Sequence, residues 1–361
     1  MDQSYLHDTR KAVDAKFEAQ KIAFAPLAFQ AARALRDLGV LEAVSASGGK
    51  GITAAVAAQN LGLSVYGVET LLEAGLSMEL VKLAKDTLPQ TYVLGKVGYF
   101  VLYDPMTRVN MDFTNDVCYR GAFSLEESVR QGKPEGLKEF GDWKTVYNGL
   151  SSLPEQARRS WFAFDHYYSD IAFPDALPHV FRNGPRRLFD IGGNTAKWAV
   201  ACFRHSPDVC VTILDLPGQL AVAQDNIRKE GAESRISTHA IDILDPAQIL
   251  PAGADTVWMS QFLDCFSIPE IKAIMGKIHA ASGPQTNVWV LEPFWDRQKF
   301  AAAAYVLHAT SLYFTCIANG NSKMYRSDVL IGAVEEAGFS LRESIDGLGA
   351  NSYSLLRFQP R

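Results

Sequence analysis

The sequence predicts an α/β protein: a mostly parallel sheet with helices on both faces, preceded by a mainly α-helical domain. Strand-like and helix-like segments alternate in the last part of the chain, beginning with RRLFDI, NTAKWAVACFRHS and VCVTILDL. Such alternation is typical of parallel strands joined by crossover helices. The first third has apolar residues at helical spacing, so we expect helices to predominate there.

We divide the chain into three predicted regions, residues 1–105, 106–184 and 185–361. The first is predicted to be a winged-helix-like domain, the second a helical connector that contributes to a substrate pocket, and the third the α/β domain. The connector contains an aromatic-rich stretch at helical spacing, Leu153–Phe173. We expect most of these side chains to be core, with one or two facing a pocket for a flat ligand.

Three segments carry the winged-helix pattern. KIAFAPLAFQAARALRDLGVLEAVSA has long apolar faces at helical spacing. Two short helices are predicted to meet at NLGLS, where Ser64 can cap the second. TYVLGKVGYFVL alternates and turns at Gly95, which predicts a two-stranded wing.

A winged helix raises the possibility of DNA binding, which the charges argue against. The candidate recognition helix, Val65–Val81, contains Glu69, Glu73 and Glu79 and neither Lys nor Arg. Such a helix would be repelled by phosphates. Its many leucines suit a subunit interface instead, so we interpret the domain as a packing or dimerisation module.

Composition and charge narrow the classes further. The chain has 361 residues, 48% of them hydrophobic and 21% charged, which is typical of a globular protein. A net charge of −5 argues against sequence-independent nucleic-acid binding. No uninterrupted run of about 18 apolar residues predicts a membrane span, and the polar N-terminus does not resemble a signal peptide. The five cysteines form no C-x-x-C pair, so we expect reduced thiols, no metal site and a cytoplasmic location.

Acids and glycines gather where the predicted strands end. Asp190, Gly192 and Gly193 lie where the first strand meets its helix, and such glycines permit a tight turn and close approach of a ligand to the backbone. Asp215 ends the next strand, 23 residues after Gly192, where a carboxylate can accept both ribose hydroxyls. Asp242 ends the third strand and could receive an adenine amino group. Alternatively, each acid is a cap or a surface-loop residue.

The glycine loop does not follow the dinucleotide pattern. A G-x-G-x-x-G template started at Gly192 fails at its third and sixth positions, which are Asn194 and Lys197. A phosphate-binding G-x-x-x-x-G-K-[ST] loop is also missing from the sequence. Asn194 is among the residues that best tolerate left-handed backbone angles. Ala196 is small enough to let the helix lie close to the strand.

FDIGGNTA matches a D-x-G-G-G-x-G loop with Asn194 and Ala196 in place of two glycines, TILDLPGQLAVA matches an acidic strand end followed by Leu-Pro, and VEEAGFSL is typical of the closing helix and strand. In these motifs, over nearly its whole length, the chain resembles the class I S-adenosylmethionine-dependent methyltransferases. It is most similar to the O-methyltransferases that act on phenols and other small hydroxyl compounds in plants and in bacterial secondary metabolism. The resemblance implies a Rossmann-like seven-stranded methyltransferase sheet, an N-terminal winged-helix dimerisation domain, a homodimer, and S-adenosyl-L-methionine as cofactor.

The resemblance also implies which residues bind the cofactor. Gly192 and Gly193 would line its methionine part, Asp215 would hold the ribose, and Asp242 with Ile243 would meet the adenine. Ser260 takes a place where plant members often have lysine. The full predicted set is Asp190, Gly192, Gly193, Asp215, Leu216, Asp242, Ile243, Met259 and Ser260.

Methyl transfer to a hydroxyl also needs a group that removes the proton. The family usually has a histidine in a Leu-His-Asp-Trp sequence, whereas this chain reads Leu263-Asp264-Cys265-Phe266. Asp264 is therefore the candidate base, although aspartate has an ordinary pKa of about 3.9 against roughly 10 for a phenol. Apolar neighbours such as Phe262 can raise that pKa by desolvation. Alternatively, Asp264 only binds substrate or caps the next helix.

Glu292 fits the position of an acid that orients the base, and a third acidic position of the family falls near Tyr325. His166 and His308 are alternative bases, although a lone histidine on an apolar helix is more often a core residue. The predicted substrate-pocket residues are Phe162, His166, Trp295, His308 and Tyr325.

The leading hypothesis is methyl transfer to a hydroxyl of a small, aromatic molecule. A second hypothesis keeps the cofactor but changes the chemistry, to hydroxylation, decarboxylation or cyclisation. A third is a ligand-sensing winged-helix protein without catalysis. Neither the acceptor nor the pathway follows from the sequence.

Overall fold

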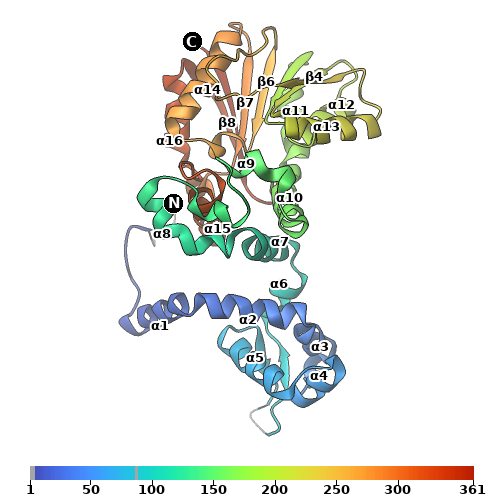
Figure 1. The fold of residues 1–361 in the computed structure, drawn as a ribbon, viewed down its shortest axis with the longest axis vertical. Coiled ribbons are helices and arrows are strands. Elements are labelled where there is room, and N and C mark those ends of the chain that lie inside the picture. Colours follow the sequence, from blue (N-terminus) through green and yellow to red (C-terminus); the bar gives the residue numbers. More distant parts are fainter. Residues whose placement is uncertain (1–4, 86–87) are drawn as a thin grey trace. The chain divides into compact units, whose positions relative to one another are not determined.

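The computed structural model describes residues 5–85 and 88–361, which form two compact units (Figure 1). One unit ends at Thr114 and the other begins at Asn115. The division into a domain, a connector and an α/β domain at residues 105 and 184 stays a prediction, because compactness alone does not define functional regions.

The N-terminal unit is mainly helical, as predicted. The cap of its fifth helix is confirmed, since Ser64 Oγ accepts the Gly67 N–H at 3.0 Å. Its core is built from fully buried apolar side chains such as Leu35, Leu41 and Leu72. The elements are α1 (Ala12–Ala23), α2 (Ala25–Asp37), α3 (Val40–Ala46), α4 (Ala54–Leu61), α5 (Val65–Ser77), β1 (Val81–Leu83), β2 (Tyr92–Leu94), α6 (Lys96–Tyr103) and α7 (Pro105–Phe113).

The predicted wing is wrong in its second half. β2 pairs antiparallel with β1, and the chain after Gly95 forms helix α6 rather than a returning strand. Close packing explains the difference: a β-carbon on Gly95 would lie 3.1 Å from the Leu80 carbonyl oxygen, and one on Gly98 would overlap it. The two glycines let α6 lie directly against the turn that precedes β1, where Val101 and Leu102 become buried.

The C-terminal unit begins with helices and continues as a seven-stranded sheet. Its first elements are α8 (Leu125–Gln131), α9 (Val146–Gly149), α10 (Glu155–Ser169) and α11 (Phe173–Phe181), joined by short turns. The later helices are α12 (Lys197–His205), α13 (Pro217–Lys229), α14 (Ile268–Ala281), α15 (Ala301–Tyr313) and α16 (Ser327–Glu336). The strands are β3 (Arg187–Ile191), β4 (Cys210–Asp215), β5 (Ile236–Ala240), β6 (Thr256–Ser260), β7 (Asn287–Glu292), β8 (Phe339–Leu348) and β9 (Tyr353–Pro360).

The sheet confirms the predicted fold class. Its strand order is β5-β4-β3-β6-β7-β9-β8, with the first five strands parallel and β9 antiparallel to both neighbours. Helices α14 and α16 cover one face of the sheet, and α11, α12 and α13 cover the other (Figure 1). β3 and β4 are adjacent, and β3 and β6 are adjacent, so the carboxyl ends of these three strands meet at one edge.

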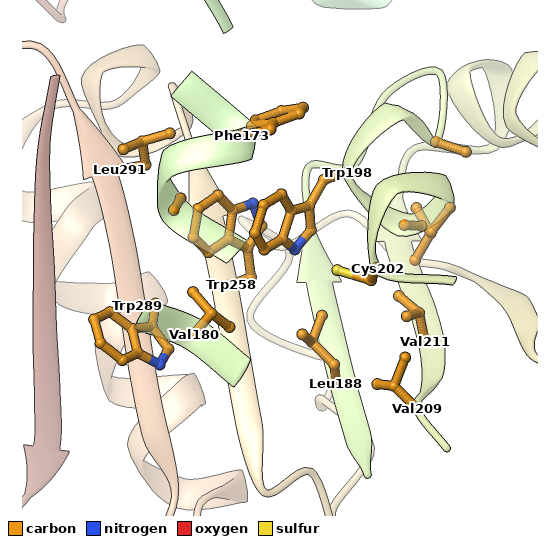
Figure 2. Close-up of a cluster of buried hydrophobic side chains, with 14 of the residues drawn as sticks. Phe173, Val180, Leu188, Trp198, Cys202, Val209, Val211, Trp258, Trp289 and Leu291 are labelled. Atoms are coloured by element: carbon orange, nitrogen blue, oxygen red, sulfur yellow. The ribbon is translucent and has the colours of Figure 1, made fainter. Parts of the chain in front are cut away.

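A stacked pair of tryptophans fixes the helix that follows the glycine loop (Figure 2). The rings of Trp198 on α12 and Trp258 on β6 lie 3.7 Å apart between centroids, with an angle of 9° between their planes. Phe173 of α11 meets the Trp198 ring edge-on at 5.1 Å. This packing holds the start of α12 against β6, which sets the position of the loop between β3 and α12.

One helix in the described part of the chain is long and apolar enough to cross a membrane, by length and composition only. It spans Ala301–Ala318, and 44% of the segment is buried inside the protein. Its buried residues include Ala304, Leu307 and Tyr313. The core helix of a globular protein meets the same criteria, so this finding is weak evidence for a membrane span.

Candidate active site

The glycine loop is held at the ends of β3 and β4 by its backbone. The Gly192 N–H donates to the Leu214 carbonyl at 2.9 Å, and the Ala196 N–H donates to the Gly193 carbonyl at 2.8 Å. Gly192, Asn194 and Ala196 all have left-handed backbone angles, with φ of 74°, 47° and 69°. Asn194 therefore adopts the left-handed backbone angle that its side chain was predicted to tolerate. Ala196 adopts a left-handed angle that its side chain disfavours.

Asp215 ties the loop to β4. Its Oδ2 accepts the Asn194 N–H at 2.9 Å, and its Oδ1 accepts the Leu216 N–H at 2.7 Å. Burial raises the pKa of Asp215, and the two backbone donors act in the opposite direction. A carboxylate oxygen has two acceptor positions, so each oxygen can still receive a hydroxyl.

Asp190 is buried beside this carboxylate. Its side chain is 2% exposed, and within the described chain its Oδ2 has no hydrogen-bond partner. Burial, assisted by the charge of Asp215, raises the pKa of Asp190 to about 8. A β-carbon on Gly193 would lie 2.6 Å from Asp190 Oδ2, so glycine leaves room for the acid. A buried polar atom without a hydrogen-bond partner lowers the stability of the fold unless a bound ligand supplies that hydrogen bond.

Other unpartnered polar atoms lie in the same part of the fold. Among the described residues, buried oxygens of Asn194, Ser260 and Gln261 have no hydrogen-bond partner. They come from the loop after β3 and from the end of β6, the strand next to β3. Together with Asp190 they mark the edge of the sheet at which a polar ligand is expected.

Ile243 and Met259 are buried, whereas Asp242 is exposed. Ile243 and Met259 belong to the core cluster that also contains Leu214. Asp242 Oδ1 accepts the Leu244 N–H at 3.0 Å, and the Asp242 N–H donates to Gln248 Oε1 at 3.0 Å. Asp242 therefore stabilises its own turn, the alternative considered from the sequence, and its contact with adenine stays a prediction.

Asp264, in the turn that follows β6, lies near Glu292 at the end of β7. Both are buried, with exposed fractions of 4% and 1%. Glu292 Oε1 accepts the N–H groups of Phe262 at 3.0 Å and Leu263 at 2.9 Å. Glu292 thus positions the turn by binding the backbone N–H groups of the turn. The sequence predicted that an acid at this position orients the base.

Burial makes Asp264 a much stronger base than an ordinary aspartate. It raises the pKa of Asp264 to about 7, against the opposing effect of the Cys265 thiol, which contacts Asp264 Oδ1 at 3.4 Å. Burial and then the charge of Asp264 raise the pKa of Glu292. The desolvation expected from the apolar neighbours of Asp264 is therefore present.

The last two turns of α10 lie against the glycine loop. Asn194 Nδ2 donates to Asp165 Oδ2 at 3.1 Å, and Thr195 Oγ1 lies 3.4 Å from His166 Nε2. Burial opposes charge on His166, but the Asp170 carboxylate, 3.7 Å away, and Asp165 raise its pKa overall. The predicted pocket residue His166 thus sits beside the loop. Phe162 stacks on its ring, with centroids 6.0 Å apart.

The remaining predicted pocket residues lie in two other places. Trp295 contacts the exposed His308, with ring centroids 5.0 Å apart. Tyr325 is buried, and its hydroxyl donates to the Phe266 carbonyl at 2.7 Å. Burial and the charge of Asp264 raise the pKa of Tyr325, which places it near the candidate base. Their contacts with substrate stay predictions.

Three polar residues near Asp264 were not predicted from the sequence: Asp165, Tyr147 and Tyr353. The Trp161 indole N–H donates to the Tyr313 hydroxyl at 2.8 Å. Tyr353 is 1% exposed, and within the described chain its hydroxyl has no partner. Asp165 could have been found from the sequence, because it is an acid within the aromatic stretch of α10. Tyr353 gave no such signal, because it is an ordinary strand residue.

The sequence of this chain matches the models of two known domains. Residues 124–340 match the O-methyltransferase domain, and residues 16–88 match a Dimerisation2-like domain. This chain belongs to the O-methyltransferase family. The resemblance stated from the sequence motifs is confirmed, and the cofactor of this O-methyltransferase is S-adenosyl-L-methionine.

Two of the similar proteins are named or solved with small aromatic molecules. A 3-hydroxy-5-methyl-1-naphthoate 3-O-methyltransferase of Streptomyces sahachiroi is 28% identical over 269 residues, which span 73% of each chain. The S-adenosylmethionine-dependent methyltransferase SibL, solved in its apo form, is 27% identical with a TM-score of 0.70, covering 94% of this O-methyltransferase and 98% of SibL. NcsB1, solved with S-adenosylmethionine and 2-hydroxy-5-methyl naphthoic acid, has a TM-score of 0.68 at 20% identity, covering 92% and 96%, which shows the shared fold.

Proposed function

We propose that Asp264 of this O-methyltransferase accepts the proton of a hydroxyl on a small aromatic molecule as that hydroxyl is methylated. The observation that carries this proposal is the position of Asp264: it is buried in the turn after β6, and burial brings its pKa to about 7. The ordinary pKa of an aspartate lies roughly six units below that of a phenol. The raised pKa of Asp264 narrows this difference in pKa by about half.

The residues around the glycine loop fit the cofactor. Asp215 keeps acceptor positions for ribose hydroxyls, and the unpartnered Oδ2 of Asp190 suits a cationic group. S-adenosylmethionine carries both ribose hydroxyls and cationic centres. We assign the methionine end to Gly192 and Gly193, the ribose to Asp215, and the adenine to the exposed Asp242 with Leu216 and Ile243 beside it.

The chain contributes orientation, a proton acceptor and exclusion of water. When bound, S-adenosylmethionine supplies an electrophilic methyl carbon. Glu292 holds the N–H groups of Phe262 and Leu263, so the turn that carries Asp264 is fixed before the acceptor arrives. The burial of Asp264 keeps water from competing for its carboxylate.

Incubation with methyl-labelled S-adenosylmethionine and a set of phenols tests this assignment. We expect labelled ethers from the wild type and a loss of methyl transfer in Asp264→Asn. Both enzymes should bind S-adenosylhomocysteine with the same affinity. Tight S-adenosylhomocysteine binding without any labelled ether in the wild type would favour the diverged chemistries of hydroxylation, decarboxylation or cyclisation.

We also propose that the enzyme is a homodimer in the cytoplasm that binds neither nucleic acid nor a membrane. The Dimerisation2-like match supports self-association. No described residue of α1 is buried within the chain, although Val13, Phe17 and Ile22 are apolar. Such exposed apolar side chains are typical of subunit interfaces. Sedimentation equilibrium of the wild type and of Phe17→Asp checks this, and a wild-type monomer would contradict it.

A further inference from the structure

Four contacts join the glycine loop, α10, the end of α15 and the turn that carries Asp264 into a closed ring. The side chain of Asn194 in the glycine loop donates to Asp165 on α10. Trp161, one turn earlier on α10, donates to Tyr313 at the end of α15. The same face of α10 therefore faces both the glycine loop and α15, because residues four apart in a helix share a face.

The ring is completed by the turn itself. Asn319, just after α15, donates from Nδ2 to the Cys265 carbonyl at 2.5 Å. On the other side, the Phe262 ring packs on Gly192 so closely that a β-carbon there would lie 2.7 Å from Phe262 Cε2. Asp165 and Asp264 thus belong to two elements that both border the glycine loop and the end of α15.

The charged groups within this ring are acids. The interactions that shift the pKa of Asp264 are burial, its contacts with Cys265 and its own turn, and the charge of Asp165. Burial, then Asp264, Glu292, Tyr168 and Asp165 raise the pKa of Tyr353. No lysine or arginine of the described chain is among these influences. His166 is a basic group whose charge acts on Asp165, and it faces Asp170 and Thr195.

Carboxylate oxygens that can still accept a hydrogen bond also lie near Asp264. Within the described residues Glu292 Oε2 is buried without a partner, and Asp165 uses one oxygen for Asn194. A carboxylate has no proton to donate when it is ionised, so it pairs with N–H and O–H groups or with cations. An anionic group placed here would meet the two acids Asp165 and Asp264, while the basic group beside Asp165, His166, already faces the carboxylate of Asp170.

We propose that Asp165 and Asp264 together select acceptors whose group beside the methylated hydroxyl is a neutral or cationic hydrogen-bond donor, such as a second hydroxyl, an amide or an amine. Acceptors with a carboxylate at that position are excluded. This inference rests on the proposed function, because it takes the surroundings of Asp264 as the place where the acceptor hydroxyl binds. Asp165 is then a specificity-determining residue that contacts the substituent next to that hydroxyl.

Salicylamide and salicylate are a matched pair of probes, because they differ mainly in the charge beside the phenol hydroxyl. Their dissociation constants are measured at neutral pH with the full-length enzyme and S-adenosylhomocysteine present, and catechol serves as a second neutral probe. We expect salicylamide and catechol to bind at least about tenfold more tightly than salicylate. Salicylate that binds as tightly as salicylamide would overturn the proposal.

Two variants test whether Asp165 causes the preference for salicylamide over salicylate. Asp165→Asn keeps an oxygen that can accept from Asn194, and it should narrow the preference for salicylamide by at least about threefold. Glu155→Gln removes one exposed negative charge from the first turn of the same helix and should leave the preference unchanged. If Asp165→Asn weakens S-adenosylhomocysteine binding while the preference stays the same, Asp165 serves the cofactor and the proposal is wrong. Because the readout is binding, a failure of methyl transfer would count against the proposed function alone.

Discussion

The ring of Phe262 occupies the space that a side chain at Gly192 would need. A β-carbon at position 192 would overlap Phe262 Cδ2 and lie 2.7 Å from Cε2, and Gly192 also has a left-handed φ of 74°. Phe262 is two residues before Asp264, in the turn whose N–H groups Glu292 holds. The glycine loop and the candidate catalytic turn therefore support each other through direct packing.

Replacing Gly192 with alanine should disturb both. We expect Gly192→Ala to lower the free energy of unfolding by about 1–3 kcal/mol, from backbone strain and the clash with Phe262. Gly218→Ala is a matched control in the first turn of α13, where a β-carbon would meet no atom within 4 Å. Denaturant unfolding should show a loss for the first variant and none for the second. Wild-type stability of Gly192→Ala would contradict the packing described here.

Asp215 and Asp242 should differ in their effect on cofactor binding. Asp215→Ala removes an acceptor for ribose hydroxyls and also leaves the Asn194 N–H without its partner, so we expect S-adenosylhomocysteine to bind at least about 100-fold more weakly. Asp242→Ala removes an exposed carboxylate that caps its own turn, so the loss should be about tenfold or less. Calorimetric titration measures both. Undisturbed binding by Asp215→Ala would remove Asp215 from the site.

The pH dependence of methyl transfer should follow Asp264. A base works only when it is ionised, so kcat/KM should rise as the pH increases through about 7, the pKa to which burial brings Asp264. Asp264→Asn should reduce kcat by roughly 10²–10⁴-fold and abolish that rise. A profile measured for both enzymes between about pH 5 and 9 checks this. An unchanged profile in Asp264→Asn would assign the proton to another group.

Glu292 should tune that profile without acting as the base itself. Burial and the charge of Asp264 raise the pKa of Glu292, which shows that the two carboxyls repel each other when both are ionised. Glu292→Gln keeps an oxygen that can accept from Phe262 and Leu263 but removes this repulsion. We expect the rise in kcat/KM to move to lower pH. A shift to higher pH, or a fold that unravels, would contradict this account.

Glu292→Ala separates positioning from charge. This variant leaves the Phe262 and Leu263 N–H groups buried without their shared acceptor. It should therefore lower the free energy of unfolding by about 2–4 kcal/mol, whereas Glu292→Gln should stay near the wild type. Denaturant unfolding of both variants at one pH measures the difference.

Much of the catalytic unit could be predicted from the sequence because its signals are local. The alternation of strands and helices, Pro217 in the first turn of α13, and the acids that end β3 and β4 all depend on neighbouring residues. The left-handed angle of Asn194 was also foreseeable from its side chain. Such short-range features survive folding, since tertiary contacts reinforce them.

The errors and omissions depend on contacts between distant segments. Gly95 resembles a hairpin turn in its local sequence, but the Leu80 carbonyl packs against Gly98 and favours a helix instead. The hydrogen bond from Asn194 to Asp165 joins residues 29 positions apart. Tyr353 reaches the surroundings of Asp264 only because β9 pairs with β7. No local sequence pattern predicts such contacts between distant segments.

The unpartnered acid Asp190 should make stability depend on pH. Because burial raises its pKa to about 8 from an ordinary value of 3.8, the folded protein binds more protons than the unfolded chain between these values. Wild-type stability should therefore fall as the pH rises from about 4 to 8, by at most about 1.4 kcal/mol per pH unit from this group. Asp190→Asn cannot ionise, so its advantage over the wild type should grow across the same interval. Denaturant unfolding at about pH 5 and pH 8, with the exposed Asp225→Asn as control, measures this. A constant difference between Asp190→Asn and the wild type would mean that the Asp190 carboxyl titrates alike in the folded and unfolded chains.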